Sequence, residues 1–518
     1  MDRNKIVSAI ADQSVLWDII VIGGGATGLG TVLDAASRGY KVLLVEQADL
    51  GKGTSSRSTK LAHGGVRYLQ QGNISLVLEA LKERGIMRRN APHLVKDLEF
   101  IVPVYDWWEG PFYGIGLKLY DLLAGKEGLG PSKFLSKEEV LIKIPTIEQE
   151  GLKGGVIYHD GQFDDARMLI NIAQTAIEQG ATVANYMKVT TLTKNEGLID
   201  GVILEDNETK QNYEVKAKVT INATGVFCDS IRQLDEEGVS PIMTSSQGVH
   251  IVFDKSFLPG ESAIMVPHTD DGRVLFAVPW LDKVIVGTTD TPVSNYLLDP
   301  IPLKEEVEFL ITHAARYLEK DPTATDIKSI FVGLRPLVKE DEENNTAAIS
   351  REHSISISRS GLLTIAGGKW TTYRKMAEEV LEKAIILGNL EPKPCSTENL
   401  QLLGYHNNAN IFGDLEPYGS AAPELINLLD ENDSYKNKLH ADYNFVEGEV
   451  IWAVRKEMAR IPEDFLARRT RLLFLDTKAC LEIVEKVTLL MASELGKDAE
   501  WINRQIESFN SLVKKYLP

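Results

Sequence analysis

The chain has 518 residues and a formal net charge of −18, with 43% hydrophobic and 25% charged residues. This composition excludes a disordered or fibrous protein, and the length predicts two or three domains. The acidic balance argues against nucleic-acid binding, and three widely spaced cysteines argue against a disulfide framework or a zinc site. No run of about 18 apolar residues is present, so we expect no transmembrane helix.

The stretch from Trp17 to Glu46 predicts a strand, a glycine turn, a helix and a second strand. Gly23, Gly25 and Gly28 fit G-x-G-x-x-G, in which the glycines permit the turn, the approach of a pyrophosphate and close helix packing. The helix N-terminus offers N–H groups to phosphates, and Glu46 can accept a hydrogen bond from a ribose hydroxyl. Glycines also simply make turns, but the flanking strands and the acid predict a dinucleotide site. Alone, the motif does not separate FAD from NAD.

A loop rich in hydroxyl groups, from Gly51 to Leu69, follows the acidic residue. Its serines and threonines at positions 54–59 can wrap a phosphate or a ring system, whereas a solvated linker has no need of the histidine, glycines and arginine beside them. Residues 74–98 then predict a helix with one basic face, from Lys82 to Lys96. Such a face is usually solvated. The alternative interpretation is contact with lipid headgroups.

Five aromatic residues between Tyr105 and Tyr113 form the next feature, in a chain that is only 7% aromatic. Aromatic clusters are most often core, but Pro and Gly interrupt this one. Amphipathic aromatic side chains beside lysines also suit a membrane interface. The sequence leaves both interpretations open for residues 105–120.

The rest of the chain predicts further strands and a second glycine turn. Residues 155–221 return to an α/β pattern, whereas residues 240–334 predict a mainly antiparallel sheet on which substrate lies. Residues 362–374 repeat the order strand, glycine turn, helix, so a second helix N-terminus can face an electron-rich group. After about residue 395 the pattern predicts a small α-helical domain, and its basic run from Arg468 to Arg471 indicates no chemistry.

Six motifs in this order resemble those of the FAD-dependent glycerol-3-phosphate dehydrogenases, the respiratory, quinone-linked family. They are GGGATG, GTSSRSTKLAHGGVRYL, QGVH, VGTTD, GLRPL and AGGKWTTYR. The resemblance implies FAD in an α/β, glutathione-reductase-type fold with an antiparallel-sheet substrate domain and a small α-helical C-terminal domain. No second complete G-x-G-x-x-G is present for NAD.

The expected FAD-binding domain is discontinuous and comprises residues 1–75, 155–240 and 335–390. Residues 76–154 and 241–334 are expected to form the substrate-binding, membrane-facing domain, and residues 395–518 the helical C-terminal domain.

The resemblance also assigns roles to individual residues. Those expected to bind FAD are Gly23, Gly25, Gly28, Glu46 and Val189 for the ADP half, and Thr54, Ser55, Ser56, His63, Gly64, Gly368, Thr371 and Thr372 for the pyrophosphate and flavin. Those expected to meet glycerol 3-phosphate are Arg67, Tyr68, His250, Arg335, Arg351 and Lys369. No metal is expected.

Phosphate recognition explains the cations in this set. A phosphate dianion calls for charge-assisted donors, which Arg67, Arg351 and Lys369 can supply, with the Tyr68 hydroxyl as a neutral donor. Any one arginine is more simply explained by a surface carboxylate. The whole set is not, because the family places these residues together.

The oxidation of glycerol 3-phosphate at its C2 atom explains the expected histidines and Arg335. The hydride goes to flavin N5 and the hydroxyl proton must be removed, a task that suits a neutral imidazole. His250 is the first candidate for this base and His63 is the second. Arg335 beside the hydroxyl would stabilise developing negative charge on the oxygen.

The electrons must then reach ubiquinone or menaquinone, the family's acceptors, which sit in lipid. We therefore expect a peripheral protein on the cytoplasmic side of a bacterial inner membrane, in contact through residues 105–120 and the basic face 82–96. A homodimer is expected as well. The sequence lacks the transit peptide and the C-terminal EF-hand extension of the animal members, so we expect no calcium regulation.

Three alternatives remain at this point. A glycerol-3-phosphate oxidase would share the fold and the first half-reaction but use oxygen, and no inserted segment typical of oxidases is detected. A related FAD-dependent amine or amino-acid oxidoreductase would handle carboxylates and amines, which fit the cation cluster less well. A flavin-binding scaffold or redox sensor without turnover would not need the set of substrate residues.

Overall fold

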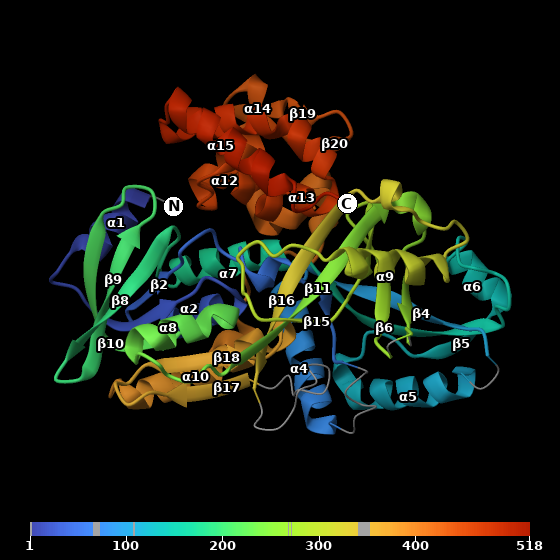
Figure 1. Cartoon of the computed structure of the whole chain (residues 1–518), viewed down its shortest axis with the longest axis horizontal. Coiled ribbons are helices and arrows are strands. Elements are labelled where there is room, and N and C mark those ends of the chain that lie inside the picture. Colours follow the sequence, from blue (N-terminus) through green and yellow to red (C-terminus); the bar gives the residue numbers. More distant parts are fainter. Residues whose placement is uncertain (1–2, 66–72, 107–108, 268, 271, 340–352) are drawn as a thin grey trace.

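The computed structural model describes residues 3–65, 73–106, 109–267, 269–270, 272–339 and 353–518. Two sheets lie side by side, and a mainly helical C-terminal unit covers them from one side (Figure 1). The expected fold class, α/β with an antiparallel substrate sheet and a helical C-terminal domain, is confirmed.

The first sheet has a parallel centre in the order β18-β10-β1-β2-β7, and β17, β9 and β8 add antiparallel strands. The strands are β1 (Leu16–Ile22), β2 (Val42–Val45), β7 (Thr182–Ala184), β8 (Met187–Asn195), β9 (Leu198–Asp206), β10 (Asn212–Asn222), β17 (His353–Ile357) and β18 (Leu363–Gly367). The chain leaves β1 toward β2, while β10 pairs with the other side of β1. Strand order therefore reverses at the carboxyl end of β1, where open α/β sheets bind ligands.

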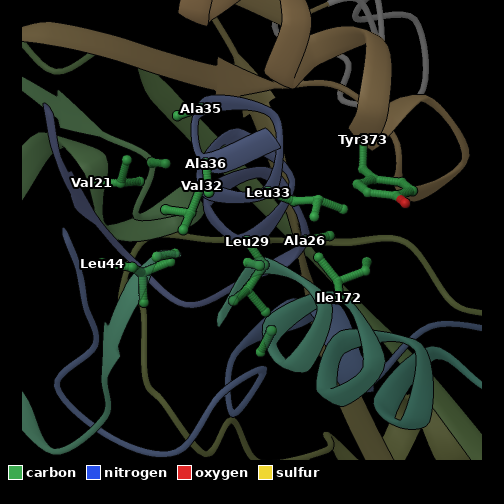
Figure 2. Packing of buried hydrophobic residues seen from close by; sticks show 14 of the residues in the cluster. Val21, Ala26, Leu29, Val32, Leu33, Ala35, Ala36, Leu44, Ile172 and Tyr373 are labelled. Atoms are coloured by element: carbon green, nitrogen blue, oxygen red, sulfur yellow. The ribbon is translucent and has the colours of Figure 1, made fainter. Parts of the chain in front are cut away.

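Three helices cover one face of this sheet: α2 (Ala26–Ser37), α7 (Asp165–Glu178) and α10 (Tyr373–Leu387). Figure 2 shows Leu29, Val32 and Leu33 of α2 packed among Val21 and Leu44 of the strands, Ile172 of α7 and Tyr373 of α10. The predicted helix forms and is buried along almost its whole length. The other side of the sheet packs against α1 (Arg3–Ala11) and the β8–β9 hairpin.

The second sheet follows the order β15-β11-β14-β13-β12-β4-β6-β3, with β16 beside β11 and β5 beside β6. Its strands are antiparallel except for the β12–β4 pair. They are β3 (Leu61–Ala62), β4 (Val95–Val104), β5 (Lys133–Ser136), β6 (Gly154–Phe163), β11 (Met243–Asp254), β12 (Ala263–Val266), β13 (Leu275–Trp280), β14 (Lys283–Gly287), β15 (Thr291–Val293) and β16 (Ser329–Val338). Strand β6 belongs to this sheet, although residues from 155 onward were expected in the FAD-binding domain.

The helices beside the second sheet differ from the prediction in their bounds. The helix expected over 74–98 is α4 (Ile74–Asn90), and residues from Val95 form β4 instead. Pro92 explains the early end, because the residue before a proline is disfavoured in a helix. Helix α5 (Glu109–Ala124) covers most of the segment 105–120. The others are α6 (Lys137–Lys143) and α9 (Lys304–Ala315), whereas α8 (Cys228–Asp235) packs against β8 and β18 of the first sheet.

The C-terminal unit packs directly on the second sheet. It contains α11 (Ala422–Asp430), α12 (Glu447–Lys456), α13 (Leu472–Leu475), α14 (Thr477–Leu495), α15 (Ala499–Val513), and a hairpin of β19 (Lys438–His440) and β20 (Tyr443–Val446). Its apolar core is continuous with Trp280 and Phe331 of the sheet. None of the helices in the described ranges is long and apolar enough to cross a membrane.

Candidate active site

A cavity of about 1330 Å³ runs from the carboxyl end of β1 to the turn after β18. Segments from both sheets line it, together with the hydroxyl-rich loop that follows β2. We refer to the part beside β1, β2 and β8 as the nucleotide end, and to the part over β11 and β16 as the reaction end.

The nucleotide end is made largely of backbone. Gly23 has a φ of +111°, and a Cβ there would lie 2.6 Å from the carbonyl oxygen of Ala223. Gly28 packs so closely that a Cβ would lie 1.9 Å from the carbonyl oxygen of Gly23, so this residue serves the turn and does not line the cavity. Gly25 lines the cavity and caps α2 without any side-chain bond, which leaves the helix N-terminus to receive an anion.

Glu46 closes the nucleotide end as predicted, at the end of β2. Its carboxylate accepts hydrogen bonds from the backbone N–H groups of Gly24 (2.7 Å) and Ala48 (2.9 Å). Burial raises the pKa of Glu46, and these N–H groups oppose that rise. Val189 of β8 lies on the cavity wall, where its backbone can meet an adenine ring.

The hydroxyl-rich loop divides its residues between the cavity and the protein interior. Ser55 lines the cavity, and its Oγ accepts a hydrogen bond from the N–H of Ala26 (3.0 Å) at the start of α2. Thr54 also lines it and donates to the carbonyl oxygen of Leu334 (2.6 Å). Ser56 is fully buried and does not line the cavity. Lys60 is buried as well, paired with Asp165 at 2.7 Å.

The second glycine turn, after β18, forms as predicted. Gly368 has a φ of +81°, which favours glycine, and lines the cavity together with Lys369 and Thr371. Thr372 faces inward and is not among the lining residues. The turn leads into α10, so backbone N–H groups face the cavity from this side too.

Strand β11 builds the reaction end because it pairs with both β14 and β16. Ser246 lies opposite Arg335 of β16, and His250 lies opposite Gly287 of β14. Alternate residues of a strand share one face, so Gly248 lies between these positions on the cavity side. A Cβ at Gly248 would come 2.5 Å from Nη2 of Arg335, so only glycine leaves room for the guanidinium.

Arg335 is held in place by a set of oxygen atoms. Its guanidinium donates to the carbonyl oxygen of Thr289 (2.7 Å) and pairs with Asp290 (3.1 Å). A third contact reaches Oγ1 of Thr288 at 3.2 Å. The charge is therefore fixed in position at the cavity wall, where it can stabilise negative charge on a substrate oxygen.

His250 is buried between neighbours that fix its ring. The imidazole stacks on Phe331 with ring centroids 4.6 Å apart, and Nε2 lies 2.9 Å from Oγ1 of Thr59. Burial lowers the pKa of His250 well below its ordinary value, and the charges of Arg335 and Lys60 lower it further. The ring is therefore neutral at physiological pH, which a proton acceptor requires.

The cavity carries positive charge although the chain is acidic. Its described lining contains six cationic side chains against three carboxylates; these are Lys52, Arg57, Lys188, Arg273, Arg335 and Lys369 against Glu46, Asp160 and Asp290. Lys52 and Arg57 pair with Glu463 and Asp299 outside the lining, so the excess of positive charge is smaller than this count. A local excess of cations can still steer an anion within an acidic protein. The reaction end can thus receive an anionic substrate.

The remaining predicted residues fall in three groups. His63 lines the cavity beside the loop. Gly64 does not; its N–H donates to the hydroxyl of Tyr120 (2.9 Å) on α5. Arg67, Tyr68 and Arg351 lie outside the described residues. The sequence predicted Thr59 only as one hydroxyl of the loop at 54–59, not as a partner of His250, and it assigned no role to Asp290, the partner of Arg335, because these partners lie far along the chain.

The residues present fit FAD. Gly25, which has no side chain, and the hydrogen-bond acceptor Glu46 fit the ADP half of FAD. At the turn containing Gly368, the backbone can come close to the flavin ring. The cavity is larger than the 300–1,000 Å³ or so of ordinary small-ligand sites, as a dinucleotide together with a substrate requires. Fold and cavity together define a flavin-dependent oxidoreductase.

Comparison with known proteins specifies the family. Residues 18–374 match the family described as FAD dependent oxidoreductase, and residues 395–502 match the C-terminal domain of alpha-glycerophosphate oxidase. The mitochondrial glycerol-3-phosphate dehydrogenase of Macaca fascicularis is 40% identical over 97% of this chain and 73% of its own length. That of Schizosaccharomyces pombe is 38% identical over 96% of this chain and 87% of its own length.

A solved structure agrees with this assignment. The glycerol-3-phosphate dehydrogenase from Bacillus halodurans, complexed with FAD, matches with a TM-score of 0.82 and 30% identity, covering 100% of this chain and 98% of that one. The chain therefore belongs to the family of FAD-dependent glycerol-3-phosphate dehydrogenases, and FAD is its cofactor.

Proposed function

We propose that this protein oxidises sn-glycerol 3-phosphate to dihydroxyacetone phosphate. The observation that carries the proposal is that Arg335, Lys369 and His250 all line one cavity that fits FAD. The names of the relatives support the same substrate. FAD, when bound, supplies the acceptor for the hydride that leaves C2.

The protein's own side chains bind the substrate and handle its proton. Lys369 at the second glycine turn attracts the phosphate dianion, and Arg67, Tyr68 and Arg351 are proposed to complete its binding. Arg335, held by Asp290 and Thr289, is proposed to face the C2 oxygen and to favour loss of the hydroxyl proton.

His250 is proposed as the proton acceptor, with His63 as the second candidate. The 2.9 Å contact between Nε2 of His250 and Thr59 orients the ring, and the stacking on Phe331 prevents its rotation. A buried, neutral imidazole next to a fixed cation can take a proton from an alcohol whose oxygen that cation stabilises.

Electrons are proposed to pass to membrane ubiquinone or menaquinone, on the cytoplasmic side of a bacterial inner membrane. The supporting surface is a set of exposed apolar side chains on α4, α5 and β5, which are Ile74, Leu78, Ile115, Leu119, Leu122 and Phe134. On α5 the exposed residues 115, 119 and 122 recur at helical spacing, so they share one side. We place the membrane contact on this surface, called the α5 face below.

The basic side of α4 does not support the lipid contact that the sequence left open. Lys82 pairs with Glu398 at 2.6 Å, Arg88 with Asp97 at 2.9 Å, and Arg89 with Glu127 at 2.7 Å. The remaining cations of this stretch are paired in the same way, Arg84 with Asp160 and Lys96 with Glu416. These charges are already balanced by carboxylates, so the α5 face carries the proposal alone.

Anaerobic reduction of the bound flavin tests the function directly. Purified holoenzyme is expected to lose its flavin absorbance on addition of glycerol 3-phosphate, and to keep it with glycerol, sarcosine or NADH. Reduction by sarcosine or another amine instead would assign the protein to the amine-oxidising relatives. Hydrogen peroxide released at the rate of substrate oxidation in air would indicate an oxidase.

A further inference from the structure

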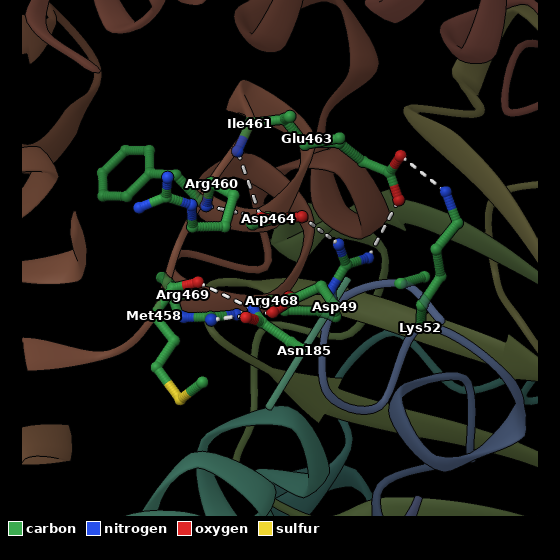
Figure 3. A network of polar contacts seen from close by, with 12 residues as sticks. Asp49, Lys52, Asn185, Met458, Arg460, Ile461, Glu463, Asp464, Arg468 and Arg469 are labelled. Carbon is green, nitrogen blue, oxygen red and sulfur yellow. Dashed lines mark hydrogen bonds and ion pairs between the residues drawn. The ribbon is translucent and has the colours of Figure 1, made fainter. Parts of the chain in front are cut away.

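The loop that leads from Glu46 into the cavity is held from outside by the C-terminal unit. Asp49 is fully buried and does not line the cavity; its carboxylate is turned toward the π-helical segment Asp464–Arg469. Arg469 binds both carboxylate oxygens of Asp49, at 2.7 and 3.0 Å, and Nε of Arg468 binds one of them (Figure 3). The pair joins residues more than 400 positions apart in the sequence.

Further ion pairs extend this contact along the same loop. Arg468 also binds Glu463 (3.0 Å) and Asp464 (2.8 Å) (Figure 3). Glu463 in turn binds Lys52 of the loop (2.8 Å). The two neighbours of Lys52 in the sequence, Gly51 and Gly53, line the cavity. At the end of the loop, Arg57 binds Asp299 (2.6 Å) and the hydroxyl of Tyr516 (3.1 Å), which comes from the last residues of the chain.

These charges are mutually dependent. Burial alone raises the pKa of Asp49, but the two arginines lower it to about 2, so the carboxylate is ionised. A buried guanidinium without its carboxylate is strongly unfavourable, and so is the reverse. Docking of the C-terminal unit therefore helps to hold the loop, and the loop supplies Asp49 as one of the counter-charges of Arg468 and Arg469.

We propose that Asp49, Arg468 and Arg469 form a cofactor clamp, through which docking of the C-terminal unit and binding of FAD stabilise one another. The inner side of the same loop carries Glu46 and residues 51–55 of the cavity wall. A loop already ordered from outside costs less free energy to order around the nucleotide. Because such coupling is reciprocal, FAD also strengthens the docking of the C-terminal unit. The three residues act by positioning the loop and do not themselves touch the cofactor.

A double-mutant cycle tests the clamp. Asp49→Asn and Arg469→Gln are each expected to raise the dissociation constant of FAD at least five-fold or so, the lower range of measured coupling. The double variant should lose little more than either single one, because both remove the same pair. With FAD at saturation, each variant should keep nearly the wild-type kcat.

Arg460→Gln is the matched control. Arg460 belongs to the same unit and makes a pair with Glu208 through two hydrogen bonds (2.7 and 2.9 Å), less buried than that of Arg469, and Glu208 lies in the β9–β10 turn and does not line the cavity. Its loss should leave FAD affinity within two-fold of wild type. Equal weakening in all variants would show that general docking, not the clamp, controls FAD binding.

Hydrogen exchange of the wild-type protein tests the clamp even if the Arg469→Gln variant does not fold. Hydrogen exchange of residues 457–475 should slow when apoprotein takes up FAD, while exchange at α15 stays unchanged.

The variant Gly25→Val separates the clamp hypothesis from the assignment of the cavity to FAD. If it leaves FAD binding intact, the assignment of the cavity to FAD is wrong. If it abolishes binding while Asp49→Asn and FAD-dependent exchange show no change, the clamp is wrong.

Discussion

The two ends of the cavity are built in different ways. The nucleotide end presents backbone groups at Gly23 and Gly25 together with the carboxylate of Glu46, all from the continuous stretch β1 to β2, and β8 and the segment after β10 complete its wall. The reaction end presents side chains, and His250 and Arg335 reach it from strands 85 positions apart that meet only in the sheet. One end should therefore determine how tightly FAD binds and the other how fast the chemistry proceeds.

The largest effect should come from the proton acceptor. His250→Gln is expected to lower kcat/KM by about 10³, within the range for loss of a general base, while flavin content stays at the wild-type level. Steady-state assays with an artificial electron acceptor measure it. His440→Gln, in the C-terminal hairpin, is the control and should have no effect. Loss of flavin in His250→Gln would contradict the separation of the two ends.

The pH profile refines this prediction. Protonation removes the lone pair that accepts the proton, so activity falls as pH drops through the pKa of His250 in the folded protein. Because burial, Arg335 and Lys60 hold that pKa well below 6.5, kcat/KM should be flat between about pH 6 and 8. In Arg335→Met one of these charges is gone, and the acid limb should move to higher pH. An acid limb at the same pH in both proteins would argue against His250.

Loss of the fixed cation should come next. Arg335→Met is expected to lower kcat/KM by about 10², comparable to removing one electrostatic donor from a reaction site. FAD affinity should be unchanged, because Arg335 acts at the other end. Arg316→Met removes an exposed arginine paired with Asp270 and should leave the rate unaltered.

A substitution at the nucleotide end should lower FAD affinity rather than the reaction rate. Gly25→Val places a side chain where even a Cβ lies 3.1 Å from Oγ of Ser55, so FAD affinity is expected to fall at least ten-fold or so, by about 1.4 kcal/mol or more. Flavin fluorescence during titration of the apoprotein measures it. Gly116→Val, on α5 with open space around it, is the matched control. An unchanged affinity would place FAD elsewhere.

These two ends also differ in how far the sequence could predict them. At the nucleotide end, Gly23, Gly25 and Glu46 could be predicted from local turns and strand ends and line the cavity, whereas Gly28 does not line it and Val189 was expected only from the resemblance. The reaction end was predicted only through the family resemblance, since the contact of Thr59 with His250 spans 191 positions. Ser56 and Thr372 illustrate the limit: Thr54, Ser55 and Thr371 line the cavity, but Ser56 and Thr372 turn inward, because packing decides which hydroxyl groups face the cavity.

The partners of charged residues were the hardest feature to predict, because they also lie far apart in the sequence. The basic run at Arg468 indicated no chemistry, yet Arg468 and Arg469 are buried against Asp49, 419 and 420 positions away. The basic face of α4 suggested lipid, yet Lys82 pairs with Glu398, which lies 316 positions away. A cation's partner is set by the tertiary fold, and a sequence window does not contain it.

A smaller effect concerns the α5 face. Ile115 and Leu122 are 73% and 76% exposed. Ile115→Glu with Leu122→Glu should shift the protein from the membrane fraction to the supernatant and leave dye-linked activity unchanged, because a charge at an apolar interface opposes insertion. Ile386→Glu, equally exposed on α10, should not change the distribution. Retention of the double variant on membranes would remove the proposed contact.

The smallest effect should come from the basic side of α4. Lys82→Gln breaks an exposed ion pair, which contributes roughly 0–1 kcal/mol at most, so stability and membrane binding should both stay near wild type. A vesicle-sedimentation assay with anionic lipid measures the binding. A clear loss of binding would restore the lipid contact for this face.

Anaerobic stopped-flow reduction of the flavin in Gly25→Val and Arg335→Met tests the separation of the two ends most directly. The flavin that Gly25→Val still holds should be reduced by glycerol 3-phosphate at nearly the wild-type rate, although less of it is bound. Arg335→Met should hold its full complement of flavin and reduce it about 10² times more slowly. If occupancy and rate fall together in both variants, the two ends are not separate and the account is wrong.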